Sequence, residues 1–194
     1  MAKSDQQLIA AANQGSQEAY RALVERYQQP VLGLLLRIVR NRPWAEDLAQ
    51  ETFVKAFRAL DSFQLERKFS SWLFKIAHNT AIDALRRRRL DTVPLEKPDA
   101  DAPDLLDCLA GPEIDSPETV LRGRDLGVSM AEAIGELRPD YRSVVEFRFV
   151  QGLAYDEIAE IMDLPLGTVK THLHRARKIL VRVLSERGWE PTGD

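Results

Sequence analysis

The segment from Leu153 to Lys178 carries the side chains with the clearest chemistry in this chain. Its first part places Ile158 and Ile161 on one face at helical spacing, and Pro165 suits the first turn of a second helix. That second helix begins at Gly167 and Thr168 and directs outward the side chains of Lys170, Thr171, His174, Arg175 and Lys178. A short helix that braces a basic one is typical of a helix-turn-helix bound in the major groove of DNA. The pattern predicts DNA binding; the alternative is an ordinary helical hairpin whose basic face is only solvated.

Charge is strongly segregated along the chain, although the formal net charge of −3 and the pI of about 5.7 conceal it. Arg86 to Arg89 are four consecutive arginines, and the helix after Gly167 adds a second basic patch. Between the patches Lys97 is the single base among the acids at positions 91, 96, 99, 101, 104, 107, 113, 115 and 118. Two basic patches that flank an acidic segment favour nucleic acid as a partner.

The remaining composition narrows the class of protein. Cys108 is the only cysteine, which excludes an internal disulfide and fits a reducing compartment. The longest apolar run ends at Arg37, too short to cross a bilayer, and the polar N-terminus lacks a signal-peptide core, so we expect a cytoplasmic protein. The three histidines, His78, His172 and His174, lack metal-ligand spacing, and no GxxxxGK[ST] loop occurs. We therefore expect no metal, no cofactor and no enzymatic activity.

Helices must position these side chains, because no segment of any length shows the alternation that a strand requires. In the first block we expect one helix to stop before Pro30 and the apolar stretch Val31 to Arg40 to form the core. Pro43 and Ser70 are expected to open the next two helices. The helices predicted before the basic one span 5–15, 18–27, 31–40, 43–60, 70–85, 117–136, 139–150 and 155–162.

The composition changes abruptly between 91 and 117. Five prolines and repeated aspartates in this segment cannot sustain a long helix or a packed core. We expect at most a brief helical turn at 104–109. The chain is therefore predicted to be all-α, with small helical domains at 1–90 and 118–194 joined by a flexible acidic linker at 91–117.

Three segments in this order resemble the bacterial RNA polymerase sigma factors of the sigma-70 family, and most closely the short extracytoplasmic-function (group 4) type. The segments are AEDLAQETFVKAFRAL at 45–60, FSSWLFKIAHNTAIDALRRRR at 69–89 and LAYDEIAEIMDLPLGTVKTHLHRARK at 153–178. The resemblance covers nearly the whole chain except the linker. It implies a σ2-like bundle, a σ4-like helix-turn-helix domain, and a dissociable subunit that directs core RNA polymerase to specific promoters, typically in a stress response.

The resemblance assigns the helix at 45–60 to binding of core polymerase, at the clamp coiled coil of the β′ subunit. The σ4-like domain would approach the β flap. The side chains implied for the core contact are Asp47, Gln50, Glu51, Lys55 and Arg58, while Phe53 and Phe57 pack inward. Polar groups at this spacing share one helix face, which suits a helix-on-helix interface as well as a simply solvated face.

The resemblance assigns residues 61–89 to recognition and opening of the −10 promoter element. Opening requires a surface that captures unstacked bases and holds their phosphates. Asn79 can both donate and accept and is the candidate for recognising a base edge. Trp72 is a candidate base wedge, with a place in the core as the alternative. The other residues implied are Phe63, Arg67 and Lys68 in a base-receiving loop, and Lys75, Arg86, Arg87 and Arg88 at phosphates.

The resemblance assigns residues 153–178 to duplex DNA at the −35 element. The residues implied are Gly167, Thr168, Lys170, Thr171, His174, Arg175 and Lys178. Two departures from the family pattern stand out. Ala154 replaces a side-chain cap, and His172 replaces an arginine, which would weaken a phosphate contact or make it sensitive to pH.

Partners and alternatives complete the prediction. Family members of this type are often held inactive by an anti-sigma factor, and one is expected here. The acidic linker would mimic nucleic acid inside the polymerase, or serve only as a solubilising spacer. The alternative function is a helix-turn-helix regulator that binds duplex DNA without being a polymerase subunit; it would not need the basic, aromatic segment at 63–89.

Overall fold

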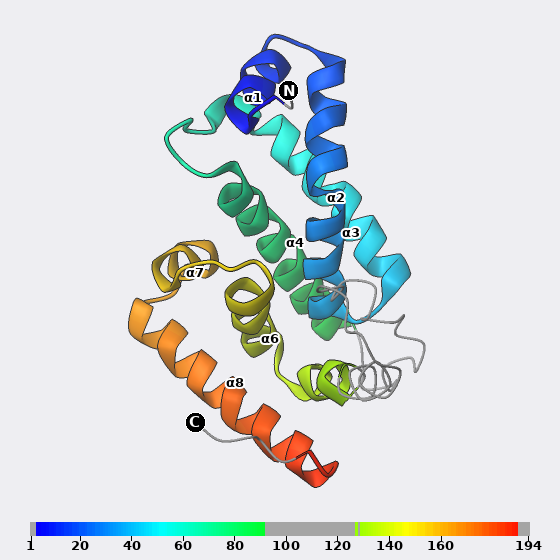
Figure 1. Ribbon diagram of the computed structural model, residues 1–194. Helices are drawn as coiled ribbons and strands as arrows, with labels where there is room; N and C mark the ends of the chain where they lie inside the picture. The colour runs from blue at the N-terminus through cyan, green and yellow to red at the C-terminus, as the bar shows by residue number, and fades with distance from the viewer. Residues whose placement is uncertain (1–2, 92–126, 128, 190–194) are drawn as a thin grey trace, which may run out of the picture.

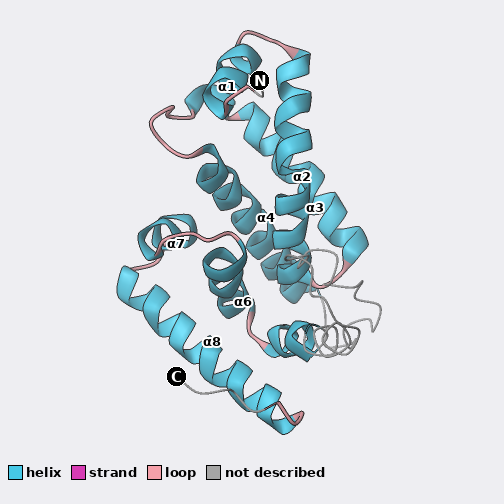
Figure 2. Cartoon of the chain, viewed as in Figure 1, coloured by secondary structure: helices cyan, strands magenta, loops and turns pink. Residues whose placement is uncertain are grey.

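The structure, a computed structural model, describes residues 3–91, 127 and 129–189. In this part of the chain every regular element is a helix, as the sequence predicts (Figures 1 and 2). The predicted linker lies outside the described residues except for Asp91, which ends a helix. The first half contains α1 (Asp5–Asn13), α2 (Gln17–Val39), α3 (Arg42–Arg58), the short turn η1 (Leu60–Ser62) and α4 (Phe69–Asp91). The second contains helical residues at 129–136, then α6 (Pro139–Val145), the π-helical turn η3 (Glu146–Val150), α7 (Tyr155–Met162) and α8 (Leu166–Glu186).

Side-chain caps define the starts of the first three helices. The Ser4 hydroxyl accepts from the Gln7 backbone N–H, and the Gln7 side chain accepts from the Ser4 N–H, which is a capping box. Ser16 caps α2 and Asn41 caps α3 through the side chain alone, which accepts from the backbone N–H of Ala19 and of Trp44 respectively. These caps fix where each helix begins and so which of its faces meets the core.

Pro30 lies inside α2, so the prediction that a helix stops before it is wrong. A proline within a helix removes one hydrogen bond and costs about 3 kcal/mol. Here the following turns bury Val31, Leu34 and Leu35 completely, and that burial offsets the cost. The predicted apolar core of 31–40 is confirmed, but it is the second half of a continuous 23-residue helix.

The second half contains the predicted helix-turn-helix. Asp163 adopts a left-handed conformation (φ 51°) between α7 and α8. Ala154 provides no side-chain acceptor at the start of α7, as predicted, but its own N–H donates to the Glu157 carboxylate at 2.9 Å. The predicted helix 139–150 is confirmed as a continuous helical stretch, but its second part, η3, winds as a π-helix and places Glu146 and Phe147 in the interior.

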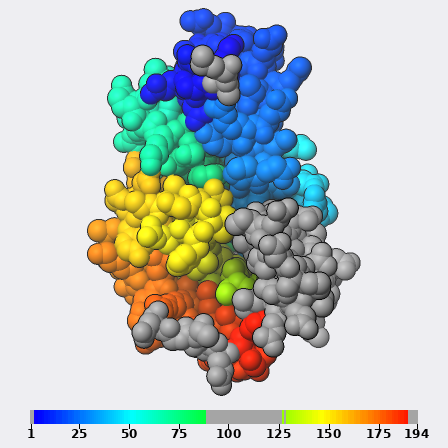
Figure 3. Space-filling view, in the orientation of Figure 1, coloured from blue at the N-terminus to red at the C-terminus, as the bar shows by residue number. Residues whose placement is uncertain are grey.

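The two halves pack directly against each other, which the sequence did not predict. Helix α7 lies against α4, and α6 lies against α2 (Figure 1). In the space-filling view the residues around 150 (yellow) abut the blue and green residues of the first half (Figure 3). Phe147 is fully buried, with its ring centroid 6.3 Å from that of Phe74 and 5.9 Å from that of His78, both on α4. The hydrophobic core is therefore continuous across the halves.

Candidate nucleic-acid and polymerase interfaces

Helix α8 presents one basic face and buries the opposite one. Val169, Ala176 and Val183 are buried at helical spacing, and α8 packs against α6 and α7. The residues predicted for duplex DNA lie exposed, apart from the half-buried Thr168; they are Gly167, Lys170, Thr171, His174, Arg175 and Lys178. The Thr171 hydroxyl donates to the Gly167 carbonyl at 2.8 Å and can still accept from a partner. This row of cations on a braced helix fits the major groove.

His172 lies on the inner side of α8, contrary to the phosphate contact that the family comparison implied for it. Its ring meets Tyr141 of α6 edge to face, with centroids 5.0 Å apart. Its Nδ1 atom is buried and has no hydrogen-bond partner among the described residues. In this structure His172 therefore contributes to packing between α6 and α8.

Aromatic side chains support the loop between η1 and α4. The ring of Phe63 lies 5.6 Å from that of Phe69 and 5.2 Å from that of Trp72. Phe63 is 8% exposed, and Trp72 is half-buried in the same cluster. In this arrangement both rings hold the loop in place, and Trp72 packs as its core alternative predicts.

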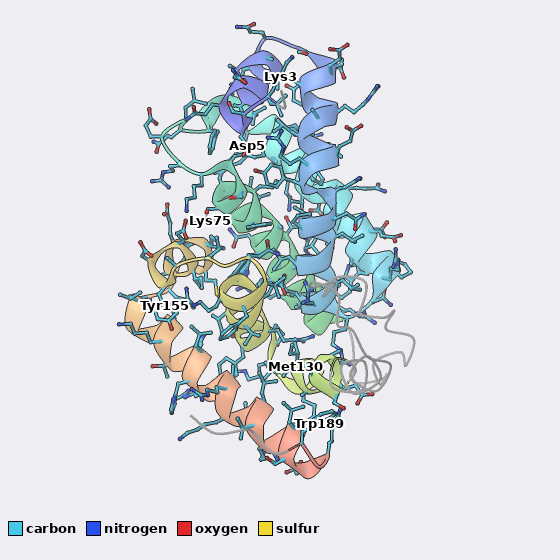
Figure 4. All side chains as sticks on the ribbon, in the orientation of Figure 1. Lys3, Asp5, Lys75, Met130, Tyr155 and Trp189 are labelled. Carbon is cyan, nitrogen blue, oxygen red and sulfur yellow. The ribbon has the colours of Figure 1, made fainter. Side chains whose placement is uncertain are left out.

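Three of the cations predicted to bind the −10 strand are engaged by two acids of α7 and by Asp163, which follows that helix. Lys68 Nζ lies 2.7 Å from Glu157 Oε1, and Arg67 pairs with Glu160. Lys75 Nζ donates to Asp163 Oδ1 at 2.6 Å and to the Glu160 carbonyl at 2.9 Å, and its side chain extends from α4 toward α7 (Figure 4). The hydrogen bond from Lys68 lowers the pKa of the Glu157 carboxyl, and the same bond raises the pKa of Lys68.

Asn79 lies at a cleft between the two halves. The cleft has a volume of about 400 Å³ and is lined from α4 by His78, Asn79, Ile82, Asp83 and Arg86. From the second half Asp140, Met162, Leu164 and His172 complete it. The exposed amide of Asn79 is thus on the same side of α4 as Lys75 and beside Arg86, so one strand of nucleic acid could follow all three.

The remaining arginines lie at the far end of α4. Arg87 and Arg88 are exposed, and the Arg88 guanidinium stacks over the Trp44 ring with Cζ 5.1 Å from its centroid. Together with Leu48 and Glu51 they line an open groove between α3 and α4. The family resemblance implies a phosphate contact for Arg88, and the structure gives it an aromatic neighbour as well.

Helix α3 displays the residues predicted for core polymerase on its outer face. Asp47, Gln50 and Arg58 are exposed. Lys55 and Glu51 form an i,i+4 pair of 2.7 Å, and Lys55 also donates to Thr80 of α4 at 3.2 Å. The inward packing of Phe57 is confirmed, since its ring lies 4.8 Å from that of Tyr20 on α2.

Sequence reasoning missed Val54 and the contacts between the halves. Val54 is 49% exposed at helical spacing from Asp47, Gln50 and Arg58, so it provides apolar area in the middle of that face. Between the halves, Arg37 of α2 pairs with Glu146 of η3 at 2.8 Å, both nearly fully buried. The signal for the second contact was a single acid inside the apolar run VVEFRFV.

The described residues contain neither a cluster of metal ligands nor a membrane-spanning helix. No group of three His, Cys, Asp or Glu side chains there is placed to hold a metal ion. No helix among residues 3–91 and 129–189 is long and apolar enough to span a bilayer.

Both halves of the chain match known protein families. Residues 23–90 match the model of sigma-70 region 2, and residues 128–180 match that of sigma-70 region 4. The chain is 35% identical over 184 residues to the RNA polymerase sigma-H factor of Pseudomonas aeruginosa, covering 94% of each chain. It is 37% identical over 179 residues to the sigma-E factor of Escherichia coli, covering 91% of this chain and 92% of that one. It is 32% identical over 179 residues to SigW of Bacillus subtilis, covering 92% and 95%.

Two solved structures share the fold. CnrH in complex with the cytosolic domain of CnrY aligns with a TM-score of 0.64 at 24% identity, over 95% of this chain and 99% of that one. The sigma factor RpoE of Bartonella quintana in complex with the anti-sigma factor NepR aligns with a TM-score of 0.63 at 22% identity, over 86% and 96%. The relatives and the structure point to the same family. The structure contributes a helical bundle with aromatic and cationic side chains and a basic helix-turn-helix. The chain belongs to the extracytoplasmic-function sigma factors of the sigma-70 family, which direct RNA polymerase to promoters.

Proposed function

We propose that the two halves of this sigma factor divide the promoter between them, with the domain boundaries at 1–90 and 118–194. Helix α8 binds the −35 element as duplex through its exposed cations. Helix α4 and the loop before it bind the −10 element as a single strand. The observation that carries the proposal is the distribution of charge, because exposed cations gather on each of these two surfaces of an acidic protein.

Promoter opening under this proposal needs no catalytic residue. Bases exposed by thermal opening are captured by Asn79 and by the loop that Phe63 and Trp72 support. Lys75 and Arg86 neutralise the phosphates of the same strand. The free energy of binding the exposed strand then drives melting, so the chain acts as a binding subunit and not as an enzyme.

Core polymerase is proposed to bind the outer face of α3 through the clamp coiled coil of its β′ subunit. Val54 provides an apolar centre, and Asp47, Gln50 and Arg58 surround it, an arrangement common in protein interfaces. The second half is proposed to contact the β flap. Because core polymerase and the chromosome share the cytoplasm of a bacterium, we place the protein there.

An anti-sigma factor is the proposed regulator. Among the solved structures that share this fold, the sigma factor RpoE was captured with the anti-sigma factor NepR, and CnrH with the cytosolic domain of CnrY. A partner of the same kind would compete with polymerase for the exposed face of α3.

Footprinting of the holoenzyme tests the division of the promoter. Wild-type protein with core polymerase is expected to protect the −35 region from nuclease and to make thymines near −10 reactive to permanganate. A holoenzyme that protects neither region, on promoter fragments selected from a random library, would contradict the proposal.

A further inference from the structure

The N-terminal helix α1 contacts the loop at 63–68, which the proposed function assigns to an unstacked base. The Gln6 side-chain amide donates to the Leu65 carbonyl at 3.1 Å, across 59 positions of sequence. In the part of the chain that the structure describes, this is the only side-chain hydrogen bond to the backbone of the loop. Helix α1 also lies against η1, the turn that leads into the loop (Figure 1). The match to sigma-70 region 2 begins at residue 23, so that match assigns no role to α1.

The loop has few restraints of its own. Residues 64–68 are all exposed, and Leu65 near the tip is 44% exposed. One turn is closed by the Arg67 N–H, which donates to the Gln64 carbonyl at 3.0 Å. A surface segment with so few buried contacts keeps a single conformation only when another element holds it.

The start of α1 is fixed firmly enough to hold the loop. Its capping box defines the first turn, and Ile9 in the second turn is 1% exposed. From α2, Arg26 pairs with Asp5 and also donates to the Lys3 carbonyl at 2.8 Å. The Gln6 amide therefore donates to the loop from a helix that is tied to both the core and α2.

A second path connects α1 with the aromatic side chains under the loop. The Tyr27 hydroxyl donates to Asp5, and the Tyr27 ring meets Phe69 edge to face, with centroids 5.3 Å apart. The Phe69 ring in turn lies 5.6 Å from that of Phe63, where the loop begins. Burial and the hydrogen bond to Asp5 raise the pKa of the Tyr27 hydroxyl, so it stays protonated and remains a donor at neutral pH. Helix α1 thus holds the loop both near its tip and at its base.

We propose that α1 positions the base-receiving loop: Gln6 is a positioning residue near the tip, and Asp5 acts through Tyr27 at the base. Neither Gln6 nor Asp5 touches the DNA in this proposal. A loop that is already held in its binding conformation loses less conformational entropy when an unstacked base arrives, so the base is captured more tightly. The inference deepens the proposed function and rests on the assignment of the loop to an unstacked base.

The first experiment removes the donor at the tip of the loop. Gln6→Met keeps the length of the side chain and loses its N–H groups. Gln17→Met is the matched control, because Gln17 is an exposed glutamine at the start of α2 with no side-chain hydrogen bond among the described residues. Each chain is assembled with core polymerase. The probe is a fluorescein-labelled single strand with the −10 element that the wild-type holoenzyme selects from a random library. A second set of probes replaces one base at a time by an abasic site.

The loss of affinity is expected to depend on the captured base. Gln6→Met should bind the intact strand about fivefold more weakly than the wild type, the effect of one hydrogen bond. At the abasic position that weakens the wild type most, Gln6→Met and the wild type should bind equally, since no base remains to be captured. Tyr27→Phe keeps the ring and loses the bond to Asp5, so it should show the same dependence on the base. Gln17→Met should bind every probe like the wild type.

A variant that restores the donor separates positioning from packing. Gln6→Arg can again donate to the Leu65 carbonyl, and its added charge acts on the intact and abasic probes alike. The ratio of its two affinities should therefore return to that of the wild type. Hydrogen exchange in the full-length chain checks the anchor directly: amides at 64–68 should exchange faster in Gln6→Met, while those of α2 keep their wild-type rates.

Three outcomes overturn the positioning role of α1. They are wild-type affinity of Gln6→Met for the intact strand, an equal loss on the intact and abasic probes, and unchanged hydrogen exchange at 64–68. Failure of the proposed function gives a different result. In that case no abasic site in the −10 element weakens binding of the wild-type holoenzyme, whatever the state of the loop.

Discussion

His78 shows how a single residue on α4 is affected by the second half. It is 4% exposed, its ring lies beside Phe147, and its Nδ1 has no hydrogen-bond partner among the described residues. Burial lowers the pKa of His78 from 6.5 to about 4, although Asp140 and Asp163 act to raise it. The folded chain therefore holds this histidine neutral where an exposed histidine would begin to take up a proton.

Because of His78, the free energy of unfolding of the chain is expected to decrease as the pH decreases. Above the unfolded pKa of 6.5, His78 is neutral in both states and no stability is lost. As the pH falls toward the folded value of about 4, the unfolded chain takes up the proton first, and stability is lost. Between pH 7 and pH 5 the loss should be about 2 kcal/mol, measured by urea unfolding. His78→Gln cannot take up the proton and should lose correspondingly less.

The comparison with His78→Gln is necessary because Glu146 acts in the opposite direction. Burial raises the pKa of Glu146, opposed by Arg37 and by the hydrogen bond from Gln151, so its effect favours folding as the pH falls. Equal losses of stability in the wild type and in His78→Gln would contradict the assignment to His78.

Asn79 has the simplest prediction for DNA. Its exposed amide sits at the cleft beside Arg86, so Asn79→Ala should remove a base contact without disturbing α3. The yield of open complex should fall roughly tenfold, since one good base contact contributes about 1–3 kcal/mol. Affinity for core polymerase should stay unchanged, as should both properties in the control Asn13→Ala, an exposed asparagine at the end of α1. Parallel loss of opening and of core affinity would count against a base contact.

At the scale of the element, the apolar residues of α8 determine which face is buried, so its basic residues face solvent. Arg175→Ala with Lys178→Ala should weaken binding to duplex −35 DNA and reduce the salt dependence of binding by about 2 in the log–log slope, about 0.9 for each phosphate contact. Arg182→Ala is the control on the same helix, because Arg182 is exposed and pairs with Glu186. A slope that falls by about 0.9 for each cation removed, in Arg182→Ala as in the double variant, would point to nonspecific attraction.

Helix α3 makes the matching prediction for polymerase. Val54→Ser removes apolar area from the centre of the face, where the few residues whose truncation costs more than about 1 kcal/mol are concentrated. Affinity for core polymerase, measured by anisotropy of the labelled chain, should fall roughly tenfold. Asp47→Ala with Glu51→Ala should also lower it, while Arg42→Ala, exposed at the start of α3, should not. Unchanged affinity in Val54→Ser would remove this face from the interface.

The elements differ in how far the sequence could predict them. The outward row of α8 was predictable because its apolar residues repeat every three to four positions and set the opposite face. Helix α2 was divided at Pro30 because local rules give proline as a helix end, whereas burial of Val31 and Leu34 decides the outcome. The contact of the His172 ring with Tyr141 was not predictable, since it depends on where another helix places Tyr141.

At the scale of the whole molecule, the sequence predicted two helical units but not their contact. Lys68 and Glu157 are 89 positions apart, and an ion pair across such a separation leaves no periodic pattern in the sequence. Glu146 within an apolar run was the only local sign of the buried centre. In the free chain the two halves therefore form one packed unit with a shared hydrophobic core.

The most direct test of the central claim is initiation reconstituted from purified parts. Core RNA polymerase lacking any sigma factor is mixed with a library of promoter fragments, and transcripts are sequenced with and without this chain. The account predicts specific start sites that appear only when the chain is added and that share −10 and −35 elements. Tight binding of the chain to duplex DNA without any specific transcript would contradict it and favour a conventional helix-turn-helix regulator.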